Sequence, residues 1–365
     1  MAMRFSNLRL RQLGRPAALV ATCGLMSVAY AHVNGFTVGP IGGNPAGVVR
    51  DDDSLGLTDA HRRALAAAIG FSETVFVREL YDGSTTPPCV LHFRYFTPTS
   101  EVDLCGHATI ASLGFLHRIG ALPAPTGRIR TLAGDVAYEL LPAPSGEGGG
   151  DSEDGARVFM EQLPAAIDPP LSADAAADVA AALGAAPLAA DWAPRVASTG
   201  LRDLLVAVGD ADALRAMAPD FARVARVSRE HSVIGFHVFD GAGARARGAG
   251  GGRTPASSAA VAVRNFAPLH GIDEESATGT SNCALACALR DAGWLDGNAT
   301  TELDFAQGDG MGAPSRITVR LPTTPGGRPW VGGQFAVVDA ARSAALLPSS
   351  DPEEEGGGGW RCLVS

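Results

Sequence analysis

One pattern occurs twice in the chain and restricts the folds that it can adopt. RYFTP at residues 94–98 leads through an acidic loop to Gly106 and an Ala-rich segment. RNFAP at residues 264–268 leads through another acidic loop to Gly279 and a second Ala-rich segment. A strand, a proline turn, an acidic loop, a glycine and a helix thus recur in one order. This repeat predicts two related halves.

Strand and helix signals are mixed in both halves, without the steady β-α-β period of a doubly wound sheet. In the first half we predict strands over 28–38, 74–80 and 90–96, helices over 58–69 and 107–119, and a hairpin over 128–141. In the second half we predict helices over 172–183 and 281–292, and strands over 158–163, 204–208, 233–239, 260–266, 317–321 and 330–338. The sequence therefore predicts an α+β fold.

Gly-rich stretches and the two ends divide the chain. Residues 145–155, 241–252 and 353–359 are each predicted to be a flexible surface insertion or tail. The resulting organisation is an N-terminal extension over 1–27, an N-terminal catalytic domain over 28–144, a linker over 145–155, a C-terminal domain over 156–330, a final return strand over 331–345 and a disordered tail over 346–365.

Charge limits the partners and the compartment. The net charge of −10 disfavours nucleic acid and an anionic membrane as partners. Residues 1–50 carry five arginines and no Asp or Glu, a composition typical of an organelle transit peptide. A disordered extension and a misassigned start site are the other interpretations. We therefore expect the protein in the cytoplasm, or in an organelle if residues 1–27 are a transit peptide.

Cysteine usage predicts no metal site. Six cysteines are too few for a disulfide scaffold in a chain of 365 residues, and no CxxC pair occurs. Cys283 and Cys287 lie four residues apart in an Ala-rich run, so they share one face of a helix. Two small apolar core residues are the expected interpretation of this pair.

Each half contains a predicted helix start that suits an anion. The first N–H groups of a helix lack partners within it, and the helix dipole favours negative charge there. Gly106 and Gly279 have no side chain, which lets the backbone approach a ligand closely. Two such helix starts facing one cleft predict a site for the carboxylate of a small substrate.

Three side chains are candidates for acid–base chemistry. Glu73 lies between Phe71 and Phe76, where loss of hydration would raise its pKa toward that of a general base. His107 lies at the predicted helix start, where the dipole favours a neutral donor or relay. Glu275 offers a second carboxylate. Taken singly, the three also fit structural roles, as a solvated cap, a structural histidine and a solvated acidic turn.

Five ordered motifs resemble the phenazine-biosynthesis-like PhzF family. They are GNPAGVV at residues 43–49, SETVFV at 72–77, RYFTP at 94–98, EVDLCGHAT at 101–109 and GIDEESATGT at 271–280. The resemblance covers roughly residues 28 to 340. It implies a diaminopimelate-epimerase-like fold of two pseudo-symmetric domains, each a curved, mostly antiparallel sheet around a central helix. It also implies a cofactor-free isomerase that moves a proton on a small carboxylate-bearing substrate, and a homodimer.

The family pattern assigns roles to residues of this chain. Glu73 matches the acid/base of the SET motif, and His107 matches the histidine of the GHAT motif. Glu275 stands at the position of the second-loop carboxylate, which is usually Asp. By the resemblance, the substrate carboxylate would be held by the backbone at two glycines, with two further substrate-binding candidates: Gly106, Gly279, Thr280 and Asn44.

Two departures from the pattern affect the substrate. Glu275 is one methylene longer than Asp, which changes how far its carboxylate reaches toward His107 or the substrate. Thr280 replaces the usual Ser, and the larger residues that follow it would narrow the pocket.

Two other functions stay open. A two-thiol racemase or epimerase needs a thiol from each half, but only the first has one, Cys105, whereas the second loop has Ser276 and Ala277. A non-catalytic binding protein of the same fold is disfavoured because Glu73, His107 and a second-loop carboxylate are all present.

Overall fold

The computed structural model describes residues 26–81, 89–142, 155–249, 260–295, 302–324, 326–348 and 360–364. The first half contains, in order, β1 (Met26–Thr37), β2 (Asn44–Arg50), η1 (Asp53–Leu55), α1 (Asp59–Ile69), β3 (Glu73–Tyr81), β4 (Cys89–Phe96), β5 (Glu101–Val102), α2 (Gly106–Arg118), β6 (Thr126–Thr131), β7 (Gly134–Pro142) and β8 (Ala156–Glu161). Each element that we predicted in this half is present, with ends that shift by a few residues.

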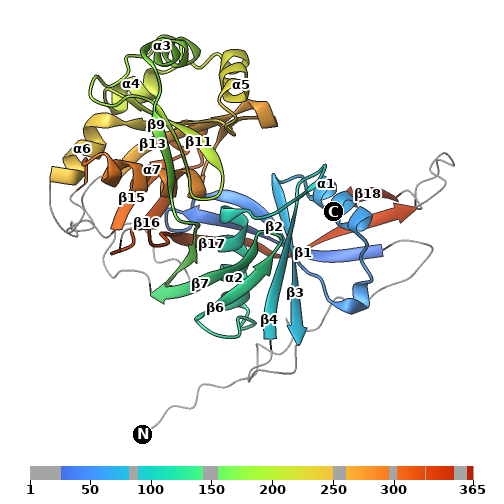
Figure 1. Cartoon of the computed structure of the whole chain (residues 1–365). Coiled ribbons are helices and arrows are strands. Elements are labelled where there is room, and N and C mark those ends of the chain that lie inside the picture. Colours follow the sequence, from blue (N-terminus) through green and yellow to red (C-terminus); the bar gives the residue numbers. More distant parts are fainter. Residues whose placement is uncertain are drawn as a thin grey trace, which may run out of the picture.

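The second half is longer and carries extra helices on its outer side (Figure 1). It contains β9 (Ala166–Pro170), α3 (Ala173–Ala182), β10 (Arg195–Ser198), β11 (Arg202–Val208), α4 (Ala211–Ala216), α5 (Phe221–Glu230), β12 (Phe236–Asp240), α6 (Gly241–Ala249), β13 (Val261–Ala267), η2 (Pro268–His270), β14 (Ile272–Glu275), α7 (Gly279–Asp291), β15 (Glu302–Gln307), η3 (Asp309–Met311), β16 (Ser315–Arg320), β17 (Trp330–Pro348) and β18 (Trp360–Val364).

Strand pairing repeats between the halves. In the first, β1–β2 and β3–β4 pair antiparallel, β2–β3 and β4–β6 pair parallel, and β6–β7–β8 continues antiparallel. In the second, β10–β11 and β12–β13 pair antiparallel, β11–β12 and β13–β15 pair parallel, and β15–β16–β17 continues antiparallel. The same order of directions occurs twice, which agrees with the repeat found in the sequence. The predicted α+β class is confirmed.

One helix in each half is surrounded by strands. α2 packs against β1, β2, β3, β8 and β17, whereas α7 packs against β10, β11, β16 and β17. Residues 107–116 of α2 and 281–289 of α7 are all buried. A helix with strands on every side buries its whole circumference, which explains why both segments are rich in small apolar residues.

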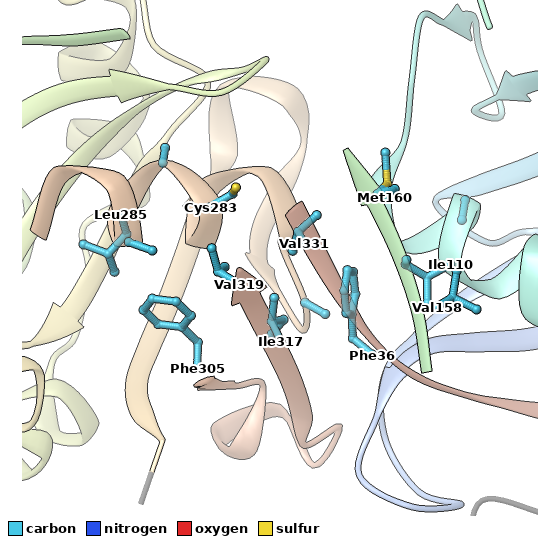
Figure 2. Packing of buried hydrophobic residues seen from close by; sticks show 14 of the residues in the cluster. Phe36, Ile110, Val158, Met160, Cys283, Leu285, Phe305, Ile317, Val319 and Val331 are labelled. Atoms are coloured by element: carbon cyan, nitrogen blue, oxygen red, sulfur yellow. The ribbon is translucent and has the colours of Figure 1, made fainter. Parts of the chain in front are cut away.

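Strand β17 joins the two halves. Its first residues pair with β8 and β16, and its later residues pair with β1, so it closes a ring of strands around α2. Figure 2 shows Phe36 at this joint, between the side chains of Val331 and Val158. Phe36 is fully buried and has a left-handed φ of 63°. Buried residues of α2 and α7 therefore form one continuous core.

Two segments differ from the prediction. Residues 241–252 were expected to form a flexible insertion, but 241–249 form α6, in which the Asp240 carboxylate accepts from the N–H of Gly243 at 2.9 Å. A Cβ on Gly248 would lie 1.6 Å from the Trp294 carbonyl oxygen, so this glycine permits close packing instead of flexibility.

The expected disordered tail over 346–365 also differs, because β17 extends to Pro348 and β18 pairs with it antiparallel. The predicted extension and linker lie almost wholly at 1–25 and 143–154, outside the described residues. Within the part of the chain that the structure describes, no helix is both long enough and apolar enough to cross a bilayer.

Candidate active site

Glu73 begins β3, next to the start of α2. Strand alternation points Val75 and Val77 toward the core around α2, whereas Phe76 points to the opposite face. Phe76 packs there against Phe96, with ring centroids 5.4 Å apart. The expectation that Phe76 desolvates Glu73 is therefore wrong, and Phe71 packs against the same cluster as Phe76. Its polar neighbours are instead His107 and Cys105.

His107 lies in the first turn of α2 and is almost fully buried. Its Nε2 is 3.4 Å from Oε2 of Glu73, and its Nδ1 is 3.2 Å from the amide nitrogen of Asn44. Burial lowers the pKa of His107, while the Glu73 charge and a hydrogen bond to the Pro45 carbonyl oppose that shift. A neutral imidazole results, as predicted, but burial is its main cause.

Glu275 ends β14, just before α7, and 21% of its side chain is exposed. Its Oε2 accepts from the hydroxyl of Thr278 at 2.7 Å, and its Oε1 lies 4.0 Å from Nδ1 of His107. Burial raises the pKa of Glu275 to about 7, and the charges of Glu73 and Asp203 act in the same direction. Near neutral pH, this carboxyl group is present in both protonation states.

Asn44 connects the two halves of the site. Its amide nitrogen faces three acceptors, namely Nδ1 of His107 at 3.2 Å, Oε1 of Glu275 at 3.1 Å and the carbonyl of Ala277 at 3.2 Å. The Ala277 carbonyl can only accept, which fixes the orientation of the amide. Two N–H groups therefore serve three acceptors, so a proton change at His107 or Glu275 redistributes these hydrogen bonds.

The starts of α2 and α7 both lack a side-chain cap. The N-cap residues are Cys105 and Thr278, and neither makes a capping hydrogen bond to its helix. Thr278 donates instead to Glu275. In the described part of the chain, no side-chain oxygen caps the first amides of either helix, although the Cys105 sulfur interacts with the Ala108 backbone; amides at such helix starts are of the kind that bind anions.

The glycines at these two starts differ. A Cβ on Gly106 would meet no atom within 4 Å, whereas one on Gly279 would lie 2.9 Å from the Phe36 ring. Thr280, the remaining predicted residue, donates to the side chain of Gln162 at 3.2 Å. Its hydroxyl therefore points away from the group formed by Asn44, Glu73, His107 and Glu275.

Sequence reasoning missed the residues that support Glu275. Gln307, at the end of β15, donates to the Glu275 carbonyl at 2.8 Å and to the Thr278 hydroxyl at 3.0 Å. It also accepts from the Thr278 N–H at 3.1 Å and from Asn282 at 3.0 Å. An isolated Gln far along the chain carries no sequence signal for this role.

Sequence reasoning also missed a second buried carboxylate, that of Asp203. Asp203 accepts from the hydroxyl of Ser281 at 2.6 Å, and burial raises its pKa to about 6. It follows Arg202 at the start of β11, in a surface-like sequence context that does not indicate burial.

The arrangement suits proton transfer, and it also contains a metal-ligand set. Glu73 and His107 are in contact, and Glu275 is linked to His107 through Asn44. Ligand atoms of Glu73, Cys105 and His107 lie within 4.8 Å of one another.

Comparison with known proteins gives a consistent result. The family model described as phenazine biosynthesis-like protein (PhzC-PhzF) matches residues 33–337. An uncharacterized isomerase of Deinococcus radiodurans is 35% identical over 302 residues, which cover 80% of this chain and 86% of that protein. The uncharacterized isomerase YddE of Escherichia coli K12 is 28% identical over 296 residues, which cover 80% and 89%.

Solved structures show the same fold. A PhzF-family phenazine biosynthesis protein of Bacillus anthracis matches with a TM-score of 0.70 and 24% identity, covering 88% of this chain and 99% of that one. A hydroxyproline epimerase of Agrobacterium vitis matches with a TM-score of 0.52 and 15% identity, covering 91% and 94%. At these identities, the structural likeness establishes the fold alone.

Proposed function

This chain belongs to the phenazine biosynthesis-like family, and from that membership we propose a cofactor-free isomerase that moves a proton on a small carboxylate-bearing substrate. Relatives that match most of the chain are themselves named isomerases. Beyond the isomerase activity named for the relatives, we propose that the reaction is a proton transfer, that the substrate carries a carboxylate, and that particular residues of this chain move the proton.

One observation carries the proposal. Oε2 of Glu73 is buried and has no hydrogen-bond partner among the described residues, although it lies 3.4 Å from His107. Leaving a buried acceptor unpaired costs about 1–3 kcal/mol, so such an atom calls for an explanation, and a catalytic role is one. A free lone pair at this position can take a proton from a bound substrate.

The other residues receive complementary roles. We assign the return of the proton to Glu275, because its pKa of about 7 lets it donate or accept near neutral pH. His107, in contact with Glu73, passes the proton or orients the carboxylate. Under the proposal, the amides at Gly106 and Gly279 hold the substrate carboxylate beside these groups.

The organisation of the chain forms part of the proposal. We propose two diaminopimelate-epimerase-like domains, over 28–144 and 156–330, with 331–345 returning to the first. We also propose a homodimer, as the family resemblance implies. Sedimentation at several protein concentrations measures the oligomeric state directly.

Proton exchange in deuterated water tests the proposed activity. Incubation with cyclic and amino carboxylic acids should label a carbon-bound position of one compound class. Glu73→Gln keeps the shape of the side chain but removes the base, so we expect the labelling rate to fall about 10²- to 10⁴-fold. Equal labelling by both proteins, or none with any compound, would contradict the proposal.

The two-thiol racemase finds little support in the geometry. Cys105 and Thr278 occupy equivalent N-cap positions, so the second helix start presents a hydroxyl where that mechanism needs a thiol. Among the described cysteines, Cys283 and Cys287 are buried inside α7. A Cys105→Ser variant that loses all labelling, while keeping its fold, would revive the thiol mechanism.

A further inference from the structure

We propose that Glu73, Cys105 and His107 form a binding site for Zn²⁺, and that the bound ion inhibits the enzyme. A carboxylate, a thiol and an imidazole are the three side-chain types that zinc binds in proteins. All three ligand atoms lie within 4.8 Å of one another. The inhibitory part rests on the function proposed above, but the binding site does not.

The distances fit a tetrahedral ion. Zinc–ligand bonds of about 2.0–2.3 Å place neighbouring ligand atoms roughly 3.3–3.6 Å apart. Oε2 of Glu73 lies 3.4 Å from Nε2 of His107, within that range. Sγ of Cys105 lies 4.0 Å from the same nitrogen and 3.4 Å from Nδ1, so zinc binding at Nε2 requires the thiol to move toward the ion.

Each ligand is available to an ion. Oε2 of Glu73 is buried and has no hydrogen-bond partner among the described residues. The Cys105 thiol is free of any disulfide, and its Sγ lies 3.4 Å from Nδ1 of His107, a contact that an ion would displace. On binding, the S–H bond breaks, sulfur coordinates the ion, and the proton passes to solvent. Three protein ligands leave a fourth position for water.

The surroundings supply the outer contacts that zinc histidines use. A zinc-bound imidazole donates its other N–H to a carbonyl or a carboxylate, which fixes the ring. Here the ring of His107 bonds to the Pro45 carbonyl. Zinc at Nε2 would leave the ring proton on Nδ1, so the Asn44 amide would give up its 3.2 Å contact with Nδ1 and keep those with Glu275 and Ala277. The charge of Glu275 also favours a cation at this place.

Zinc and the proposed reaction exclude each other. The lone pair of Glu73 that takes the substrate proton is the one that would bind the ion. We therefore expect reversible inhibition by Zn²⁺, relieved by a chelator.

Metal binding is measured first, without substrate. Cobalt replaces zinc as a spectroscopic probe in the full-length, metal-free protein, and calorimetry follows zinc itself. We expect one equivalent to bind, with a thiolate-to-cobalt charge-transfer band. Cys105→Ser should abolish the band and weaken zinc binding more than about tenfold, the loss that even outer-shell changes can cause.

Two further variants complete the binding experiment. Glu73→Gln should weaken zinc binding while keeping the cobalt–sulfur band, because the thiolate remains. Cys287→Ser is the matched control, since Cys287 lies inside α7 and outside the ligand set. It should bind both metals as the wild type does. No stoichiometric binding by the wild type, or a band that survives Cys105→Ser, overturns the site.

The exchange assay then tests inhibition separately. One equivalent of Zn²⁺ should reduce substrate labelling at least tenfold, and a chelator should restore it. Zinc that binds without lowering the rate overturns the inhibition and leaves the proposed isomerase intact. A protein that labels no compound contradicts the isomerase, while the cobalt band still decides the metal site.

Discussion

At the scale of single residues, the side-chain amide of Asn44 links the two halves of the site by hydrogen bonds. It reaches from the beginning of β2 to His107 on α2 and to Glu275 before α7. An uncharged side chain thus contacts both His107 and Glu275, the two groups whose protonation the proposed mechanism depends on. The pattern GNP in the sequence indicated a turn, and only the family resemblance marked Asn44 as a binding residue.

Removal of that amide gives the first prediction. Its hydrogen bond lowers the pKa of Glu275, so Asn44→Ala should raise the Glu275 pKa above its present value of about 7. The limb of the rate–pH profile that reports this carboxyl should move to higher pH. The rate should also fall roughly tenfold, since about 1 kcal/mol of hydrogen bonding is lost.

Asn34→Ala is the control for that experiment. Asn34 holds the same turn by donating to the Gly42 carbonyl at 2.7 Å, but it does not contact Glu275. Asn34→Ala should lower the free energy of unfolding but leave the rate–pH profile unchanged. An Asn44→Ala profile that coincides with that of Asn34→Ala would show that Asn44 serves only the fold.

At the scale of elements, the two helix starts are alike in the chain but differ in their surroundings. Gly106 faces open space, and Gly279 packs against Phe36. The N-terminus of α2 can therefore admit a ligand directly over its glycine. At α7, the glycine is required because the joint between the halves is closely packed.

This contrast gives the second prediction. Gly106→Ala should leave thermal stability nearly unchanged and raise KM, because its methyl group stands beside the amides proposed to hold the substrate. Gly279→Ala should instead lower the free energy of unfolding by about 1–3 kcal/mol through overpacking against Phe36. Thermal melts and initial rates separate the effects. An unchanged KM for Gly106→Ala would mean that α2 does not bind the carboxylate.

Elements with a strong local signal could be predicted from the sequence. Thr58 caps α1 as expected, and the alternation over 74–80 and 90–96 gives β3 and β4. Short strands such as β10 and β14 escaped prediction because four residues carry too little periodicity. α6 escaped because its glycines resemble a linker, whereas Gly248 is required by tertiary packing against Trp294.

The sequence predicted which residues form the site, but not the environments that set their charge states. Glu73, His107, Glu275 and Asn44 do meet, as the motifs indicated. The wrong step was the environment of Glu73, since neighbours in sequence on a strand point to opposite faces. Burial of Asp203 depends on contacts from α7, 78 residues away, and leaves no local trace.

At the scale of the whole molecule, buried titratable groups make stability depend on pH in two opposing ways. Burial raises the pKa of Asp203 to about 6 and that of Glu275 to about 7. Burial lowers the pKa of His237 to about 4 and also lowers that of His107. The carboxyls make the folded state bind more protons than the unfolded state, and the histidines make it bind fewer. Because these contributions overlap in pH and oppose each other, the net slope of stability with pH does not identify any single group.

The difference between the wild type and Asp203→Asn isolates one group and gives the third prediction. Below about pH 3, Asp203 is protonated in both states and adds no slope. As pH rises toward 6 and beyond, the unfolded carboxyl ionises first, so the wild type loses up to about 3 kcal/mol of unfolding free energy.

Asp203→Asn should lack that loss, so its stability relative to the wild type should rise steadily between about pH 4 and pH 7. Denaturant unfolding at several pH values measures the difference. Asp168→Asn is the matched control, because Asp168 is an exposed carboxylate on β9, two strands from β11, and it pairs with Arg202. A difference curve for Asp203→Asn that is flat with pH would show that Asp203 has the same pKa in the folded and unfolded states, so that the Ser281 hydrogen bond offsets the effect of burial.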